Sequence, residues 1–295
     1  MLIYVKLVLT AMFWGGTFIA ARVVTRGIDA YSVAFLRFFT ASILLMVVSV
    51  KIEGGLTRVK VRQILPLVIL GVTGIFAYNI FFFKGMKIVE AGRAALIVAT
   101  CPVFITAFSA VFLKERLTFL KIAGIFISLA GAAIVITRGD LTQIAGGSFG
   151  VGEIYILGCV MCWVVYSLVG KQVMKELSPL TAVAYSSVVG TVLLFFPAVY
   201  NGLFEKIAGA SFVEWVCVGY LAVFGTVVGF VWYYEGVREI GAVRAGLFIN
   251  LVPVSGVALG FLILNEPVSF SLAVGGALVI TGVYMTNKAP VNRGS

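Results

Sequence analysis

Ten long apolar segments constrain the fold of this chain more than any other feature of its sequence. They lie at about residues 4–24, 30–50, 63–83, 91–113, 118–137, 150–170, 180–200, 213–234, 243–263 and 269–287. Each segment is about 20 residues long, which is the length that a helix needs to cross the hydrocarbon core of a bilayer. A transmembrane barrel would instead alternate apolar and polar residues in segments of about ten. We therefore expect an all-α integral membrane protein with ten transmembrane helices.

The composition favours lipid over water as the surroundings of the fold. Apolar residues make up 61% of the 295 residues and charged residues 12%, whereas soluble domains contain roughly 45–50% apolar and about 25% charged residues. The net charge of +10 does not indicate nucleic acid as a partner, because lysines and arginines lie in the short gaps between the apolar segments. The expected partners are the lipid bilayer and a small-molecule substrate.

The placement of these basic residues predicts the orientation in the membrane. If the N-terminus lies in the cytoplasm, about twice as many of the lysines and arginines outside the spans face the cytoplasm as face the other side. We therefore expect a multi-pass protein of the cell inner membrane with both termini in the cytoplasm. The polar segment 288–295 is expected to be a disordered tail.

The chain also aligns with itself. Residues 13–38 match residues 162–187 at an offset of 149, and residues 71–133 match residues 222–284 at an offset of 151. The matched pairs include Gly74 with Gly225, Gly85 with Gly236, Arg93 with Arg244, Pro102 with Pro253, Glu115 with Glu266, Gly124 with Gly275 and Gly131 with Gly282. Each half holds five spans, so the second half enters the membrane from the opposite side. We expect two five-helix repeats, residues 1–140 and 148–287, in a 5+5 inverted-topology arrangement, which is typical of secondary transporters with a binding site between the halves.

Several motifs resemble those of the EamA family of the drug/metabolite transporter (DMT) superfamily. They are Trp14-Gly15-Gly16-Thr17-Phe18, Leu36-Arg37-Phe38, Pro102-Val103, Leu113-Lys114-Glu115-Arg116-Leu117-Thr118, Asn250-Leu251-Val252-Pro253-Val254 and Leu264-Asn265-Glu266-Pro267-Val268-Ser269. The resemblance covers about residues 1–287. It implies a ten-helix 5+5 fold with cytoplasmic termini and the export of amino acids or related small polar metabolites. The first-span motif changes to Trp163-Val164-Val165-Tyr166 in the second half, so the two halves need not contribute equally.

Two prolines mark predicted irregularities in the fourth and ninth spans. Pro102 and Pro253 have no N–H group to donate to the carbonyls of Val98 and Ile249, four residues earlier in the sequence. Within a bilayer a freed carbonyl must find another partner or face a polar cavity. We predict that the prolines kink their helices beside the substrate path, with a purely structural kink as the alternative. Asn250, three residues before the second proline, is a candidate substrate-binding residue.

The other substrate-binding candidates are aromatic and polar residues deep within spans. Trp14 and Thr17 share one face of the first span, and Trp163 and Tyr166 share the equivalent face of the sixth. Tryptophan usually marks the membrane interface, yet these tryptophans lie far from the predicted span ends. They either pack in the core or line an aromatic cavity that accepts an apolar body.

The second and third spans add three more candidates. Tyr78 follows Gly71 and Gly74 at helical spacing, and the glycines predict close helix packing beside it. Tyr78 and its neighbour Asn79 are candidate substrate-binding residues, with a helix–helix hydrogen bond as the alternative for the amide. Arg37 lies about seven residues into the second span. We expect a structural or gating role for this arginine rather than contact with the substrate.

The chain contains no histidine and places no Asp or Glu deep within a predicted span. We therefore expect no metal site, no cofactor and no enzymatic activity, since an intramembrane lipid-modifying enzyme would need a general base and a nucleophile or metal. Proton-coupled carriers usually need a deep carboxylate, so facilitated diffusion or exchange is the expected mode of transport. An exchanger of nucleotide sugars or other organic anions is the alternative, although it would need several cationic groups facing the cavity. The sequence leaves a homodimer open.

Overall fold

The computed structural model describes residues 2–54, 57–112, 118–136, 139 and 150–288, which form helices with no strand among them. The helices of the first half are α1 (Leu2–Val24), α2 (Ala30–Glu53), α3 (Val61–Leu70), η1 (Gly71–Ala77), α4 (Tyr78–Met86), α5 (Ala91–Val98), α6 (Cys101–Phe112) and α7 (Phe119–Ile136). Those of the second half are α9 (Val151–Val173), α10 (Pro179–Tyr200), α11 (Leu203–Gly209), α12 (Phe212–Ala222), η2 (Val223–Val228), α13 (Gly229–Ile240), α14 (Ala242–Gly246), η3 (Leu247–Asn250), α15 (Leu251–Leu264) and α16 (Phe270–Lys288). Residues 289–295 of the predicted tail lie outside the described residues.

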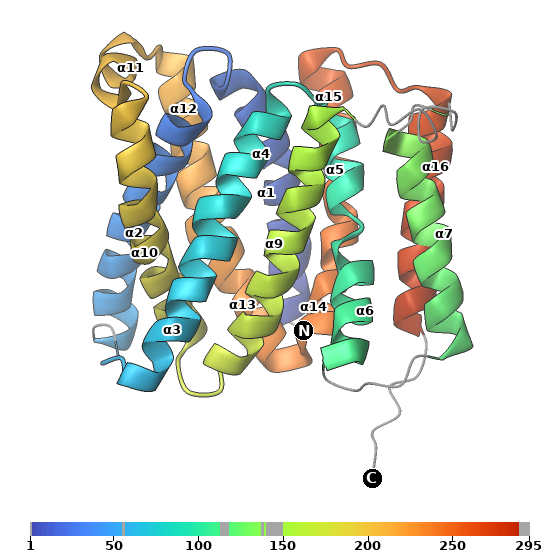
Figure 1. The fold of residues 1–295 in the computed structure, drawn as a ribbon, viewed down its shortest axis with the longest axis horizontal. Coiled ribbons are helices and arrows are strands. Elements are labelled where there is room, and N and C mark those ends of the chain that lie inside the picture. The colour runs from blue at the N-terminus through green and yellow to red at the C-terminus, as the bar shows by residue number, and fades with distance from the viewer. Residues whose placement is uncertain (1, 55–56, 113–117, 137–138, 140–149, 289–295) are drawn as a thin grey trace.

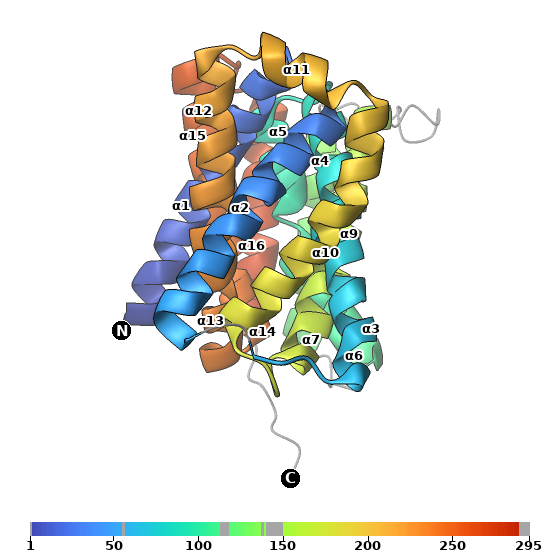
Figure 2. The ribbon, with the colours of Figure 1, turned by 90° about the vertical axis from the view of Figure 1, so that its left-hand side faces the viewer.

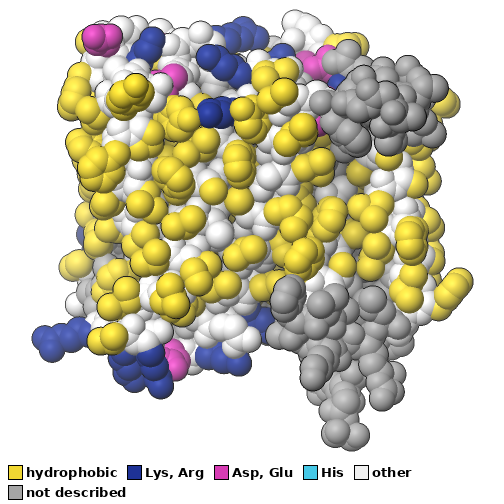
Figure 3. Space-filling model, viewed as in Figure 1, with side chains coloured by type: hydrophobic (Ala, Val, Ile, Leu, Met, Phe, Trp, Pro, Cys, Tyr) yellow, Lys and Arg dark blue, Asp and Glu magenta, His cyan; other side chains and the backbone are white. Residues whose placement is uncertain are grey.

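The all-helical architecture predicted from the apolar segments is confirmed in the part of the chain that the structure describes. Eight helical stretches there are long and apolar enough to cross a membrane, and two shorter apolar stretches, Ile122–Val135 and Phe270–Gly282, lie in α7 and α16. Figure 3 shows hydrophobic side chains covering the middle of the visible face, with charged side chains gathered at its two ends. This distribution matches a protein whose middle is surrounded by hydrocarbon.

The helices run side by side along one common direction, and the start of α1 and the end of α16 lie at the same end of the molecule (Figures 1 and 2). Helices of the two halves alternate as neighbours. α1 packs against α12, α13 and α15, α9 packs against α4, α5 and α6, α2 packs against α10, and α7 packs against α16. The two halves therefore share one interior rather than forming separate bodies.

Two equivalent helices begin with equivalent caps. Asp29 precedes α2, and its carboxylate accepts hydrogen bonds from the backbone N–H groups of Tyr31 (2.9 Å) and Ser32 (3.1 Å). Ser178 precedes α10, and its hydroxyl oxygen accepts from the N–H group of Thr181 at 3.0 Å. Both residue types satisfy donors that the first helical turn leaves unpaired. The two caps are separated by the offset of 149 that relates residues 13–38 to residues 162–187.

Two kinds of irregularity recur at matched positions. The π-helices η1 (Gly71–Ala77) and η2 (Val223–Val228) are related by the second alignment to within one residue. A break at Ala99–Thr100 separates α5 from α6, and the 3₁₀-helix η3 interrupts the corresponding segment between α14 and α15. Each break lies shortly before one of the two prolines. Irregular backbone is tolerated at membrane depth only where protein or a cavity surrounds it.

The glycines predicted to allow close helix packing do lie at close contacts between the halves. A Cβ atom on Gly225 would lie 2.8 Å from Cγ2 of Thr17, and one on Gly74 would overlap the ring of Tyr166. The alignments match these glycines with each other, and they match Thr17 with Tyr166. The same holds further along the helices, where a Cβ atom on Gly236 would lie 2.7 Å from Cδ2 of Leu7. The prediction of close packing is therefore confirmed.

A buried ion pair joins three helices near one end of the molecule. Nη1 of Arg93, in α5, lies 3.1 Å from Oε1 of Glu153, in α9, and both side chains are almost fully buried. Nε of the arginine also donates to the carbonyl of Val135, in α7, at 2.9 Å. The pair thus links two helices of the first half to one of the second.

Candidate functional site

A small cavity lies between helices of the two halves. Its volume is about 40 Å³, which is room for a few water molecules because one water needs roughly 10–15 Å³. The lining residues are Trp14, Thr17, Phe18, Arg37, Tyr78, Phe82, Val98, Trp163, Phe230, Ile249 and Val252. Most of the wall is therefore aromatic or aliphatic, and Arg37 is the charged residue in it.

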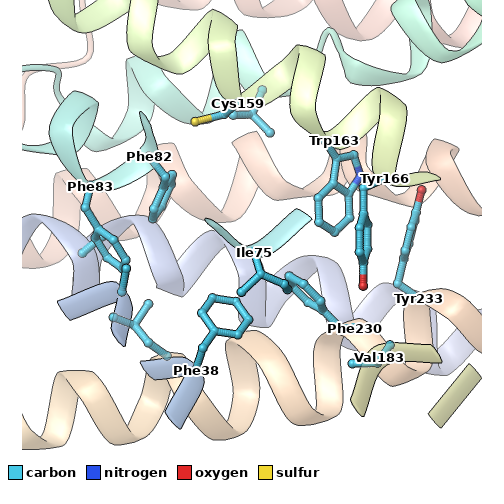
Figure 4. Packing of buried hydrophobic residues seen from close by; sticks show 14 of the residues in the cluster. Phe38, Ile75, Phe82, Phe83, Cys159, Trp163, Tyr166, Val183, Phe230 and Tyr233 are labelled. Atoms are coloured by element: carbon cyan, nitrogen blue, oxygen red, sulfur yellow. The ribbon is translucent and has the colours of Figure 1, made fainter. Parts of the chain in front are cut away.

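Aromatic rings from both halves form much of this wall. Trp14 and Trp163, which the self-alignment matches, meet edge to face with ring centroids 5.3 Å apart. Phe230 lies 6.0 Å from the first tryptophan and 5.3 Å from the second, and Tyr233 lies 5.4 Å from each. Figure 4 shows Trp163 and Tyr166 gathered with Phe230 and Tyr233 in the interior. The tryptophans thus pack in the core and face the cavity at the same time.

Arg37 is buried in this wall with neutral partners. Its side chain is 3% exposed, and it donates from Nε to the hydroxyl of Thr226 at 2.8 Å, from Nη1 to Oδ1 of Asn79 at 3.0 Å, and from Nη2 to the carbonyl of Gly225 at 3.3 Å. The guanidinium carbon lies 5.0 Å from the ring centre of Phe38. None of the ion pairs between described residues includes this arginine.

The acceptors for Arg37 come from one π-helix and from the helical turn that follows the other. Gly225 and Thr226 belong to η2, and the carbonyl of Gly225 also accepts from Nε1 of Trp14 at 3.1 Å. Asn79 lies two residues after the end of η1, in α4, and its side-chain amide donates to the carbonyl of Ile75, within η1, at 2.8 Å. π-helices are rare and occur often at functional sites. Their position beside one buried arginine therefore indicates that this region is the functional site.

The two helix breaks also reach the cavity. Val98 and Ile249, whose carbonyls have no N–H partner at Pro102 and Pro253, are both lining residues. Pro102 lies in the first turn of α6 and Pro253 in the first turn of α15, so each proline begins a helix rather than bending a continuous one. Asn250 ends η3, and its side chain lies outside the part of the chain that the structure describes.

The remaining predicted residues lie at the cavity or directly behind it. Tyr78 lines the cavity, with its ring centroid 5.5 Å from that of Trp163. Thr17 also lines it and donates its hydroxyl proton to the carbonyl of Trp14 at 2.6 Å. Tyr166 is fully buried and stacks on Tyr234 at 5.0 Å, so it supports the aromatic wall from behind, as Asn79 supports Arg37.

The sequence analysis did not single out Phe230 and Thr226. The self-alignment matches Phe230 with Asn79, which is the one signal that points to it. Thr226 is an ordinary residue of an apolar segment, and its contact with Arg37 joins positions 189 residues apart. No local pattern in the sequence reports such a contact.

The comparisons with known proteins agree with this architecture. The model of the EamA-like transporter family matches twice, at residues 1–137 and 150–288. An uncharacterized transporter of Bacillus subtilis, YyaM, is 29% identical over 95% of this chain and 92% of its own length. A probable terminal-alkyne amino-acid exporter of Streptantibioticus cattleyicolor is 30% identical over 97% of this chain and 94% of its own length.

A solved structure shares the fold. One protein of known crystal structure superimposes on this chain with a TM-score of 0.69 at 22% identity, and the superposition covers 95% of both chains. The family match spans nearly all of the sequence, and the described helices are long and apolar enough for several membrane crossings. The chain therefore belongs to the EamA-like transporter family and is a multi-pass membrane transporter.

Proposed function

We propose that this protein is a secondary transporter that exports amino acids or related small polar metabolites across the inner membrane by alternating access. The observation that carries the proposal is the cavity between the halves, which combines an aromatic wall, a buried arginine and two helix breaks. Interrupted helices at a site between two repeats are the usual construction of secondary transporters.

The mechanism requires ten transmembrane helices in a 5+5 inverted-topology repeat. The two matched family segments support it, as do the equivalent π-helices and the contacts of Gly74 and Gly225. Because the start of α1 and the end of α16 lie at one end of the molecule, an even number of crossings fits the fold. The excess of basic residues supports a cytoplasmic position for this end.

The substrate class follows from the lining. The aromatic wall suits an apolar side chain, while Arg37 suits a polar group. The amino-acid exporter among the relatives supports the same class. Nucleotide sugars are the second candidate, but their diphosphate would need more than the single cation that lines the described cavity. Because no carboxylate lines it either, we expect exchange or facilitated diffusion rather than proton coupling.

Counterflow in liposomes tests the function. Liposomes that contain the purified protein are preloaded with a single unlabelled amino acid. They are expected to accumulate the labelled amino acid from outside without an imposed proton gradient. Parallel vesicles receive purines or nucleotide sugars. Uptake confined to nucleotide sugars would replace the substrate class, and uptake that requires a proton gradient would contradict the proposed energetics.

Asn79 provides a residue-level test. Asn79→Leu removes the amide oxygen that accepts from Arg37, and a hydrogen bond to a charged group contributes about 1.5–3 kcal/mol. We expect the transport rate per folded molecule to fall by about tenfold. The control is Asn201→Leu, because that exposed amide donates only to its own helix at Pro197. Unchanged transport by Asn79→Leu would remove this residue from the site.

A further inference from the structure

The charge of Arg37 is incompletely satisfied by its neighbours. A guanidinium carries five N–H groups, and the described contacts use three of them, one on each nitrogen. One N–H group on each terminal nitrogen remains without a partner among the described residues. All three acceptors in use are neutral oxygens.

A buried cation without a counter-ion is costly. Removing a charge from water carries a penalty that hydrogen bonds to neutral groups only partly offset, which is why buried charges are normally paired. Elsewhere in the described part of the chain a buried arginine does have an acidic partner, since Arg93 contacts Glu153. Arg37 differs in lining the cavity, so an anion that enters there would complete its coordination.

Two further buried donors lie close to the cavity. They are Nε1 of Trp163 and the hydroxyl of Tyr166, and both residues are buried. Trp163 lines the cavity, and its ring centroid lies 5.3 Å from that of Tyr166. The interior of the site is therefore rich in N–H and O–H donors, which fits an acceptor-bearing group on the solute.

We propose that Arg37 binds the carboxylate of the transported solute, and that this carboxylate rather than the amino group is what the site recognises. The inference rests on the proposed transport function and adds the recognised group to it. The free N–H groups on the two terminal nitrogens suit the two oxygens of a carboxylate. This assignment differs from the gating role that the position of Arg37 in the sequence predicts.

The site offers less to an ammonium group. No carboxylate lines the cavity, so the ammonium of an amino acid is left with neutral groups, chiefly the ring faces. These neutral groups bind a cation more weakly than a desolvated guanidinium binds a carboxylate. Solutes with the carboxylate and without the amine are thus substrates, whereas amines without the carboxylate are not.

The role of the carboxylate can be tested on the wild-type protein with two sets of ligands. Each set contains an amino acid, the amine that lacks its carboxylate and the keto acid that lacks its amine. One set is phenylalanine, phenethylamine and phenylpyruvate, and the other is leucine, isoamylamine and 4-methyl-2-oxopentanoate. Binding is followed by the fluorescence of Trp14 and Trp163, which line the cavity, and transport by counterflow. We expect the amines to bind at least about 100-fold more weakly than the amino acids, and the keto acids to bind within about tenfold of them.

Variants of the arginine provide the second arm. In Arg37→Gln the carboxylates are expected to lose at least about 100-fold in affinity, with no preference left between acids and amines. Arg37→Lys is expected to recover part of the loss, because an ammonium cannot reproduce bidentate binding. The control is Arg26→Gln, which removes the same charge from an exposed loop position. If Arg37→Gln does not fold, the ligand sets on the wild-type protein decide the question.

The outcomes separate this inference from the transport proposal. Wild-type protein that binds amines as well as amino acids, or a folded Arg37→Gln variant that keeps its preference for acids, would overturn the role of Arg37 while leaving amino-acid transport intact. Binding of uridine diphosphate glucose with no binding of either carboxylate set would overturn both proposals.

Discussion

Gly131→Ala is expected to destabilise the protein by about 3 kcal/mol or more, which is the upper range for inserting atoms into a packed interior. The added Cβ would lie 2.6 Å from the carbonyl oxygen of Gly275 and 2.7 Å from the backbone nitrogen of Val279. Both are backbone atoms of α16, so no side-chain rotation can make room. The helices α7 and α16 would have to separate.

The unfolding midpoint of the purified protein in detergent measures this effect. Gly282→Ala should behave similarly, because its Cβ would lie 2.5 Å from the carbonyl oxygen of Gly124. Gly219→Ala is the matched control, since this helical glycine has no atom within 4 Å of the added carbon. Alanine there should be neutral or slightly stabilising. Equal midpoints for the Gly131 and Gly219 variants would contradict the close contact between the two helices.

Glu153→Gln is the second change with a large expected effect. It removes the carboxylate that pairs with buried Arg93, and breaking a buried ion pair on one side costs about 3–5 kcal/mol. The double variant Arg93→Met with Glu153→Leu should recover much of this loss, because an apolar pair of similar volume avoids the uncompensated charge.

A double-mutant cycle on the unfolding midpoints, made of the single variants Arg93→Met and Glu153→Leu and their double variant, measures the coupling between these two residues. The control is Glu176→Gln, whose exposed carboxylate pairs with Arg62 at 2.8 Å and whose loss should leave the midpoint close to that of the wild-type protein. If the losses of the two single variants simply add in the double variant, the two side chains do not interact as an ion pair.

The positions of the helices could be predicted from hydropathy because the lipid acts on each segment separately. A helix in a bilayer must satisfy its own backbone, so its extent depends on its own apolar residues. The interruptions follow a different rule. Pro102 and Pro253 predict the helix breaks that precede them. By contrast, nothing in the composition of Gly71–Ala77 distinguishes a π-helix from an α-helix. Its hydrogen-bond register depends on contacts with other helices.

The site residues that the internal duplication matches could be predicted from the sequence, whereas the contacts that it does not repeat could not. Trp14 and Trp163 could be paired through the duplication, and the structure brings their rings together. The direction of Arg37 could not be predicted, because hydropathy does not distinguish a side chain that reaches the surface from one that binds Thr226 in the second half. Such contacts depend on how the two halves meet.

The π-helices fix which way the segments after them face. One residue of an α-helix corresponds to about 100° of rotation, so an additional residue within a turn changes the direction of every later side chain. Asn79 and Phe230 hold matched positions just after η1 and η2. If either segment rewound into a regular α-helix by one residue, Asn79 would turn away from Arg37, or Phe230 away from the tryptophans. The phase of these two helices, and not only their sequence, therefore determines what the cavity presents to a solute.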